Sequence, residues 1–368
     1  MVKKVLFISP LPPPHYGSAL SSEMCLNILR GSRDFEVRSI KLNYSRKMND
    51  LGKINFDKII GIFKVKNQIK KEIKNFKPDI VYFMPATSSL GLLRDAYFIK
   101  QIKKIWKGKI LFHIRARILE EDWKNKRKRK ILSGMLKDQK AIVLGEELVR
   151  DLHGLIKNEN IFILPNAIKN DVSDKQLKEI LKERKKNKQL EILFISNMDR
   201  TKGWPKLLEA CKILDKKNIN FRCGFVGAWQ SKKDKEYFEN FVKRNNLQNK
   251  VFSLGKKIGK EKRKILEKTD VLVFPTEYKL ETFGRVILEA YMFMVPVIAN
   301  GIATILSTVK HGKTGFVLKE NNPKEISRYL EKLQDIKLRE KIGKAGRKRF
   351  LDNFELENYK KEFKWILK

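Results

Sequence analysis

Short apolar runs alternate with helical patterns along the whole chain. Strand-like runs cover residues 79–84, 141–145 and 221–227, and a helical pattern covers residues 324–333. Strands that alternate with helices form parallel sheets, because each helix returns the chain across the sheet in a right-handed crossover. The alternation occurs twice over, so we predict an α/β fold with two doubly wound parallel-sheet domains.

The most informative stretch contains two glutamates eight positions apart. Residues 270–275 read as a buried parallel strand, and apolar residues at three and four spacing predict a helix over 283–292. Glu281 then lies in the connecting loop, and Glu289 lies about 12 Å further on at about 1.5 Å per residue. Gly284 near the helix start lets a ligand approach the backbone, where first-turn N–H groups favour an anion.

This layout suits a sugar nucleotide, since one carboxylate can meet a hexose and the other a ribose. A chain with 42 acidic residues also places two glutamates at this spacing by chance. The spacing alone leaves both interpretations open, and the surrounding residues favour the first.

Those surroundings match a known signature, which is Glu, seven residues, Glu, and then Pro-Val-Ile. The matching residues are Glu281, Phe283, Gly284, Val286, Glu289, Ala290, Pro296, Val297 and Ile298. In this the sequence resembles the retaining nucleotide-sugar glycosyltransferases of family four, the group 1 glycosyltransferases. The resemblance implies the GT-B fold, with two Rossmann-like domains facing a cleft. It also implies that Glu281 contacts the donor sugar and Glu289 the ribose.

The resemblance covers nearly the whole chain and is strongest from about residue 160 to 320. Further matching segments are residues 1–8, 163–168, 197–203, 225–227, 254–255 and 311–316. The phosphate loop matches in part: Lys202 and Gly203 are present just before a helical pattern at 204–214. That position puts an ammonium beside a helix N-terminus, which suits a diphosphate, although a solvated lysine is the alternative.

Two departures from the family concern the donor. Many relatives carry Arg where this chain has Asn197, so one diphosphate contact is either missing or comes from Arg200. Residues 292–295 and 303–307 also differ from the family, which predicts unusual donor packing. The remaining donor contacts implied by the resemblance come from Gly17 and from the segment Thr282, Phe283 and Gly284.

The amino-terminal half normally brings a glycine-rich loop and a histidine to the site. Of the glycines only Gly17 remains, with a tight-turn glycine as the alternative. His113 and Arg115 lie at the end of a strand predicted at 109–114, and either can occupy the histidine position. Arg115 can instead contact phosphate, and His113 can be a core histidine.

For catalysis, the sequence offers charge stabilisation and no evident protein nucleophile. Lys202, with Arg200 or Arg115, would stabilise the leaving diphosphate, and backbone N–H groups near residues 282–284 would assist. Retention would follow from attack on the face that the leaving group departs from, as proposed for the family. There is no Asp-x-Asp motif, so we expect no metal requirement and no cofactor beyond the donor substrate.

The length of 368 residues suits two domains. We predict an amino-terminal domain over 1–168, a connecting segment over 169–189, and a nucleotide-sugar domain over 190–354. The last helix, 355–368, is expected to pack back on the first domain, as in the family. The three cysteines, Cys25, Cys211 and Cys223, have no metal-binding spacing, which indicates a reducing compartment.

Net charge is the second strong signal, since 81 basic and 42 acidic residues give +39. Such a field attracts polyanions or anionic membrane surfaces. The densest run, 124–130, contains Lys126, Arg127 and Arg129 and leads into apolar residues at 131, 132, 135 and 136, an amphipathic pattern able to lie at a membrane interface. A second basic stretch covers 64–77. A solvated face in a lysine-rich protein is the alternative.

We therefore predict a cytoplasmic glycosyltransferase, soluble or peripheral at the inner membrane face. Its acceptor would be lipid-linked or of lipopolysaccharide or polysaccharide type. A nucleic-acid-binding protein is the main alternative, but basic residues are spread over the chain and no recognised nucleic-acid module appears. A sugar-nucleotide epimerase on the same fold is a third interpretation. The donor sugar, base and linkage stay open.

Overall fold

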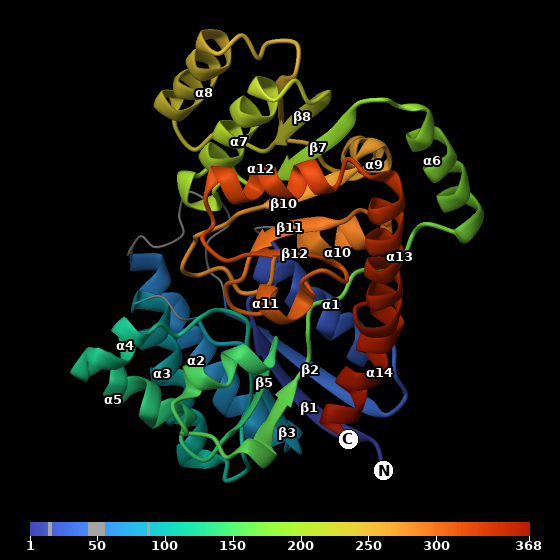
Figure 1. The fold of residues 1–368 in the computed structure, drawn as a ribbon. Coiled ribbons are helices and arrows are strands. Elements are labelled where there is room, and N and C mark those ends of the chain that lie inside the picture. Colours follow the sequence, from blue (N-terminus) through green and yellow to red (C-terminus); the bar gives the residue numbers. More distant parts are fainter. Residues whose placement is uncertain (14–16, 43–55, 87–88) are drawn as a thin grey trace. The chain divides into compact units, whose positions relative to one another are not determined.

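The computed structural model describes residues 1–13, 17–42, 56–86 and 89–368. The chain divides into two compact units (Figure 1). The first unit comprises residues 1–165 and 360–368, and the second comprises residues 166–359.

The first unit contains a parallel sheet with strand order β2-β1-β3-β4-β5-β6. Its strands are β1 (Lys3–Ser9), β2 (Phe35–Lys41), β3 (Ile80–Phe83), β4 (Leu111–Ile114), β5 (Lys140–Val143) and β6 (Ile161–Ile163). Its main helices are α1 (Gly17–Arg30), α2 (Phe56–Phe76), α3 (Ser89–Ile105), α4 (Glu120–Lys124) and α5 (Lys126–Leu136). The order reverses at β1, so right-handed crossovers place helices on both faces of the sheet.

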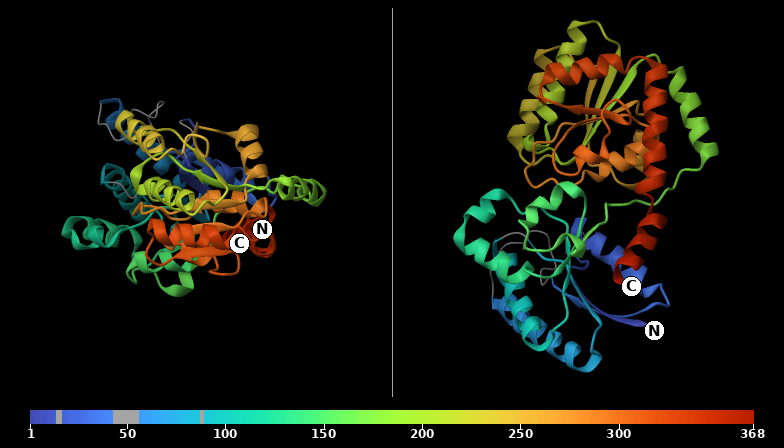
Figure 2. Two further views of the ribbon diagram at one scale, coloured as in Figure 1. Left: turned by 45° about the horizontal axis from the view of Figure 1, so that its top comes forward. Right: turned by 60° about the horizontal axis from the view of Figure 1, so that its bottom comes forward.

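The second unit repeats this plan with strand order β12-β11-β10-β7-β8-β9. Figure 2 shows its sheet with helices on both faces. Its strands are β7 (Leu190–Ile195), β8 (Phe221–Val226), β9 (Val251–Gly255), β10 (Val271–Phe274), β11 (Val297–Asn300) and β12 (Gly315–Leu318). Its helices are α6 (Asp174–Lys186), α7 (Trp204–Lys216), α8 (Lys232–Arg244), α9 (Gly259–Lys268), α10 (Arg285–Met292), α11 (Ile305–Thr308), α12 (Pro323–Lys332) and α13 (Ile336–Asn353). The predicted α/β class with two doubly wound parallel sheets is confirmed.

The predicted helix over 283–292 begins two residues late. Gly284 is its N-cap and has φ 70°, in the left-handed region that glycine tolerates best. A Cβ there would also lie 2.9 Å from a ring carbon of Phe274. The left-handed backbone of Gly284 is not helical, so α10 starts at Arg285. The close approach to Phe274 favours glycine at this cap.

The predicted connecting segment over 169–189 is wrong. Residues 174–186 form α6, which starts at a Ser173 capping box and belongs to the second unit. Leu177 and Arg184 are buried on its inner face. The sequence shows no apolar face for this helix, because one of its two buried side chains, Arg184, is charged.

Two buried arginines hold the carboxyl ends of helices in the second unit. Arg184 donates to the carbonyls of Leu266 and Glu267 in α9 at 2.7 and 2.8 Å, and to that of Phe293 after α10 at 2.9 Å. Arg347 of α13 donates to the carbonyl of Met292 at 2.7 Å. Cations at these positions satisfy orphan carbonyls and complement the helix dipole.

The chain returns to the first unit at its end. Helix α14 (Leu356–Leu367) lies across the division, which falls after Tyr359. Phe363 is fully buried, with its ring centroid 5.9 Å from that of Tyr82 and 6.4 Å from that of His113. The last turns of the chain therefore complete the core of the first unit.

Replacement of Arg347 by Ala should destabilise the second unit by about 2–4 kcal/mol, because the buried carbonyls of Met292 and Val172 lose their donors. Urea unfolding followed by circular dichroism measures this change. Lys348→Ala is the control, since the Lys348 side chain is 77% exposed. Equal unfolding midpoints for the two variants would contradict the capping role.

Candidate functional site

Two loops of the second unit meet beyond the carboxyl ends of neighbouring strands. Strands β7 and β10 pair in parallel, and the loop after each carries predicted site residues. Gly203 has φ 82°, and a Cβ there would lie 2.1 Å from the carbonyl oxygen of Pro275. Glu277 N–H donates to the carbonyl of Thr201 at 2.7 Å. Only glycine allows the loops to approach this closely.

The approach brings Lys202 and Glu281 together. Lys202 Nζ lies 2.9 Å from Glu281 Oε2, and the side chains are 15% and 17% exposed. Glu281 Oε1 accepts from Gly284 N–H at 3.2 Å, so the carboxylate is held against the start of α10. Lys202 Nζ also lies 3.8 Å from the ring centroid of Tyr278. An anionic group can thus bind Lys202, and a hydroxyl of the same ligand can donate to Glu281 beside it.

Glu289 has a partner that the sequence analysis missed. Its Oε1 lies 2.7 Å from Nζ of Lys262 on α9. Glu289 and Lys262 are 21% and 29% exposed, so both are reachable from solvent. No pattern singles out Lys262 among so many lysines, and only the tertiary structure, which brings it within 2.7 Å of Glu289, reveals it.

The two residues after Glu281 are held in place by a backbone hydrogen bond and by core packing. The Thr282 carbonyl accepts two hydrogen bonds from Thr304, one from its hydroxyl at 2.6 Å and one from its backbone N–H at 3.3 Å. Phe283 is 2% exposed and packs edge-on against Phe354 at 5.9 Å. Its side chain therefore belongs to the core, and a donor contact by its backbone stays a prediction. Thr304 belongs to the segment that departs from the family, and here it secures the loop.

Arg200 and Asn197 lie in the loop after β7 that also carries Lys202. Arg200 Nε pairs with Asp234 Oδ1 of α8 at 2.6 Å, and its guanidinium covers the ring of Tyr237 at 4.5 Å. Asn197 is exposed. Asp199 accepts from Thr201, whose hydroxyl and N–H lower the pKa of that carboxyl. The structure directs Arg200 towards α8 and not towards Lys202.

In the first unit, His113 at the end of β4 is completely buried. Its Nδ1 lies 2.6 Å from Tyr82 Oη, and Arg115 Nη1 lies 3.2 Å from its Nε2. A guanidinium only donates, so Nε2 accepts and the ring proton sits on Nδ1, facing Tyr82. Burial, with the charge of Arg115, holds the pKa of His113 well below its usual range. The predicted direct catalytic role is corrected, because the ring is covered on all sides.

Arg115 and Gly17 lie elsewhere at the carboxyl edge of the first sheet. Arg115 is partly exposed, and its Nη2 donates to Ser21 Oγ of α1 at 3.2 Å. Gly17 begins α1, and a Cβ there would meet no atom within 4 Å. Sterics alone therefore do not demand glycine at this position.

Helix α5 presents only part of the predicted amphipathic surface. Lys126, Arg127 and Arg129 are exposed. The apolar residues Leu132, Met135 and Leu136 are buried within the first unit, so the prediction that they lie at a membrane is wrong. Among the described residues, no helix is long and apolar enough to cross a membrane.

Comparison with solved structures identifies the fold. A glycosyltransferase from Rickettsia africae ESF-5 superposes with TM-score 0.71 at 20% identity, covering 100% of this chain and 99% of that one. Anabaena Alr3699/HepE in complex with UDP and glucose superposes with TM-score 0.69 at 15% identity, covering 99% of both chains. The chain has the GT-B fold. At these identities the likeness concerns the fold alone.

Sequence comparison finds a family model that matches part of the second unit, and several relatives. Residues 175–349 match the family model described as glycosyl transferases group 1. The capsular polysaccharide biosynthesis glycosyltransferase CapM of Staphylococcus aureus is 31% identical over 166 residues, 44% of this chain and 41% of that protein. The sulfoquinovosyl transferase SQD2 of Arabidopsis thaliana is 35% identical over 152 residues, 39% of this chain and 28% of that protein. The matches therefore span less than half of these relatives' length.

The state of His113 can be measured directly. At pH 6.5, where an ordinary histidine is half protonated, the His113 ring should stay neutral with its proton on Nδ1. Long-range ¹H–¹⁵N correlation spectra report both properties, and His113→Asn identifies the signal. The unfolded chain binds a proton below about pH 6.5 that the folded ring does not, so this group lowers stability as the pH falls. A midpoint near 6.5 in the folded protein would refute the assignment.

Proposed function

We propose that this protein is a retaining glycosyltransferase that moves a sugar from a nucleotide diphosphate donor to a lipid-linked, lipopolysaccharide or polysaccharide acceptor. The observation that carries the proposal is the Lys202 and Glu281 pair at 2.9 Å, inside the segment that matches group 1 glycosyltransferases. The similar proteins support the acceptor class, since they include glycosyltransferases of capsular polysaccharide and putative colanic acid biosynthesis.

Lys202 is the proposed contact of the donor diphosphate. Its ammonium is mostly buried against Glu281 and Tyr278, where a charge acts more strongly than in bulk water. Phosphate oxygens that bind this ammonium compete with the Glu281 carboxylate for it. The first turn of α10, which starts at a glycine without a capping side chain, favours negative charge beside the same loop.

The two carboxylates then serve the two sugars of the donor. Glu281, held by Gly284 N–H, can accept from hydroxyls of the transferred sugar. Glu289, whose charge Lys262 balances, can accept from the ribose hydroxyls. Glu281 lies in the loop before α10 and Glu289 lies on α10, an order that suits the two sugars of a sugar nucleotide.

In the proposed reaction the bond from the anomeric carbon to the diphosphate oxygen breaks, and its electron pair leaves with the diphosphate. An acceptor hydroxyl oxygen forms the new bond on the same face of the sugar. Its proton passes to the departing phosphate oxygen. Lys202 stabilises the developing negative charge, so we propose that transfer needs neither a metal ion nor a further cofactor.

Substitutions of Glu281, Glu289 and Lys202 should separate nucleotide binding from turnover. Glu281→Gln should keep nucleotide binding and lose turnover, whereas Glu289→Gln should mainly weaken nucleotide affinity. Lys202→Ala should lower turnover on the order of 10²- to 10³-fold, as the loss of an oxyanion donor does. A thermal-shift panel of uridine and guanosine diphosphate sugars identifies the donor, because bound ligand stabilises the fold by mass action. Transfer of a labelled sugar from that donor then measures turnover.

Lys206→Ala is a matched control, because Lys206 pairs with Glu277 near the same loops without contacting either site glutamate. It should keep both binding and turnover. Full activity in Glu281→Gln would refute the site, and a panel in which no nucleotide sugar shifts the midpoint would refute the function. Conversion of the donor to an epimer without transfer would assign an epimerase instead.

We also propose that the exposed basic face of α5 attracts the anionic inner surface of the cell membrane. Leu132, Met135 and Leu136 of α5 are buried and only Ile131 is partly exposed, so binding would rest on charge more than on insertion. Each basic residue near such a surface contributes about 1 kcal/mol, and salt weakens it over a Debye length of about 8 Å.

Reversal of Lys126, Arg127 and Arg129 to Glu should abolish sedimentation with anionic vesicles and leave transfer to a short soluble acceptor largely intact. Reversal of Lys232, Lys233 and Lys235 on α8 changes the net charge equally and should have little effect on sedimentation. Equal binding of the parent protein to neutral and anionic vesicles would overturn the proposal. Tight, salt-sensitive binding of nucleic acid would favour the alternative function.

A further inference from the structure

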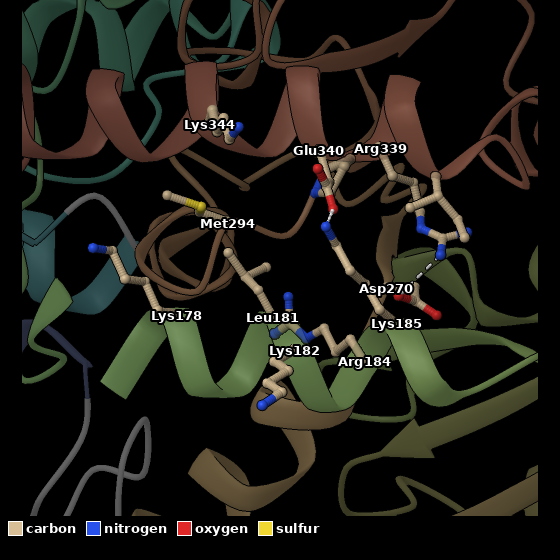
Figure 3. Close-up of a pocket in the computed structure, with 12 residues that line it drawn as sticks. Lys178, Leu181, Lys182, Arg184, Lys185, Asp270, Met294, Arg339, Glu340 and Lys344 are labelled. Carbon is tan, nitrogen blue, oxygen red and sulfur yellow. Dashed lines mark ion pairs between the residues drawn. The ribbon is translucent and has the colours of Figure 1, made fainter. Parts of the chain in front are cut away.

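A pocket of about 480 Å³ opens between α6 and α13 in the second unit (Figure 3). Asp270 and Pro296 line it and lie just before β10 and β11. The pocket therefore sits at the amino ends of these strands. Lys202 and Glu281 follow the carboxyl ends, at the opposite edge of the sheet, so this pocket is separate from the candidate donor site.

The pocket has an apolar part of useful size. Leu181 comes from α6, Ile336 from α13, and Met294 and Pro296 from the turn between α10 and β11. Pockets that hold small molecules typically measure about 300–1,000 Å³ and are largely apolar with a few polar groups. This one falls within that range and can cover a short hydrocarbon chain.

The charged lining is mainly basic. It consists of Lys178, Lys182, Arg184, Lys185, Arg339 and Lys344, with Asp270 and Glu340 as the acids.

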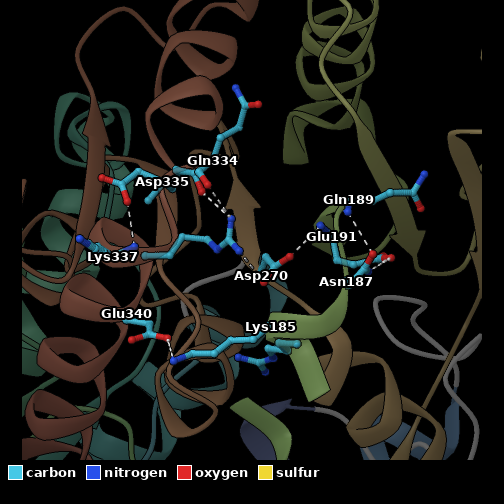
Figure 4. Close-up of polar contacts among 12 residues, drawn as sticks. Lys185, Asn187, Gln189, Glu191, Asp270, Gln334, Asp335, Lys337 and Glu340 are labelled. Atoms are coloured by element: carbon cyan, nitrogen blue, oxygen red, sulfur yellow. Dashed lines mark hydrogen bonds and ion pairs between the residues drawn. The ribbon is translucent and has the colours of Figure 1, made fainter. Parts of the chain in front are cut away.

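Both acids already have cationic partners. Lys185 Nζ lies 2.7 Å from Glu340, and Arg339 Nη2 lies 3.5 Å from Asp270 (Figure 3). Asp270 also accepts from Glu191 N–H at 3.0 Å (Figure 4). Three lysines of the lining, Lys178, Lys182 and Lys344, therefore remain without an acid at ion-pair distance among the described residues.

Arg184 adds a buried cation to the lining, and the charges of Asp270 and Glu267 offset only part of its desolvation. Its guanidinium is bonded to three carbonyl oxygens, which carry no net charge, and burial lowers its pKa to about 10. Within the part of the chain that the structure describes, no carboxylate lies at ion-pair distance from Lys178, Lys182 or Lys344. An anion in the pocket would offset this concentration of like charge.

We propose that the pocket binds an organic phosphate with an apolar chain. The phosphate lies among Lys178, Lys344 and the guanidinium of Arg184, since ammonium and guanidinium groups are the usual partners of phosphate oxygens. The hydrocarbon lies on Leu181, Met294 and Ile336. This site goes beyond the proposed transfer and does not depend on it.

Calorimetric titration with geranyl phosphate tests the site. Geranyl phosphate should bind more tightly than either inorganic phosphate or geraniol, because each of these lacks one half of the ligand. Decaprenyl phosphate in neutral phosphatidylcholine nanodiscs forms the second arm. Binding in both arms assigns a membrane lipid as the source, and binding of the soluble ester alone assigns a free metabolite. Affinity for geranyl phosphate no better than that for inorganic phosphate or geraniol overturns the proposal.

A charge-matched pair of variants locates the binding. Lys178→Glu with Lys344→Glu should weaken geranyl phosphate binding about tenfold or more. Lys175→Glu with Lys341→Glu lies on the same two helices outside the pocket and should change it less than about twofold. Both should keep the cooperative urea unfolding transition of the parent protein, followed by circular dichroism, which shows that the variants are folded. Equal weakening in the two variants would place the ligand elsewhere.

Discussion

Two buried guanidinium groups fix the carboxyl end of α10, and the geometry of the second unit depends on them. Arg347 holds the carbonyl of Met292, and Arg184 holds that of Phe293 while also binding the end of α9. Helices α9 and α10 carry Lys262 and Glu289, whose ion pair requires both helices to stay in place. The structural arginines and Glu289 thus depend on the same helices, whereas Glu281 lies before the amino end of α10.

Lysines balance both site carboxylates. Lys202 pairs with Glu281, and Lys262 pairs with Glu289, each below 3 Å. In a chain with a net charge of +39, such pairs leave an overall positive field around the loops. The proposed diphosphate substrate would compete with the Glu281 carboxylate for Lys202, and the excess of basic residues would offset the negative charge that it brings.

The first unit uses its polar residues differently. His113 is neutral and buried, and it accepts from Arg115, which also reaches Ser21 on α1. The histidine therefore orients the arginine at the edge of the sheet. On α5, the apolar face completes the core and leaves a basic face to solvent. In both places the sequence pattern predicts a functional residue, but the structure gives that residue a supporting role. His113 positions Arg115, and the buried residues of α5 anchor its basic face.

By itself the sequence determined the two parallel sheets, the strand and helix around residues 270–292, and the likeness that marked Lys202 and Glu281. These features follow from local patterns, because period and spacing reflect which backbone state a segment adopts. Only the tertiary structure showed that Lys262 forms an ion pair with Glu289 and that the buried side chain of Arg184 attaches α6 to the second unit. Burial of His113 and of the apolar side of α5 was likewise settled there. Each depends on residues far apart in the chain, and a linear pattern shows that a face is apolar or charged but not what covers it.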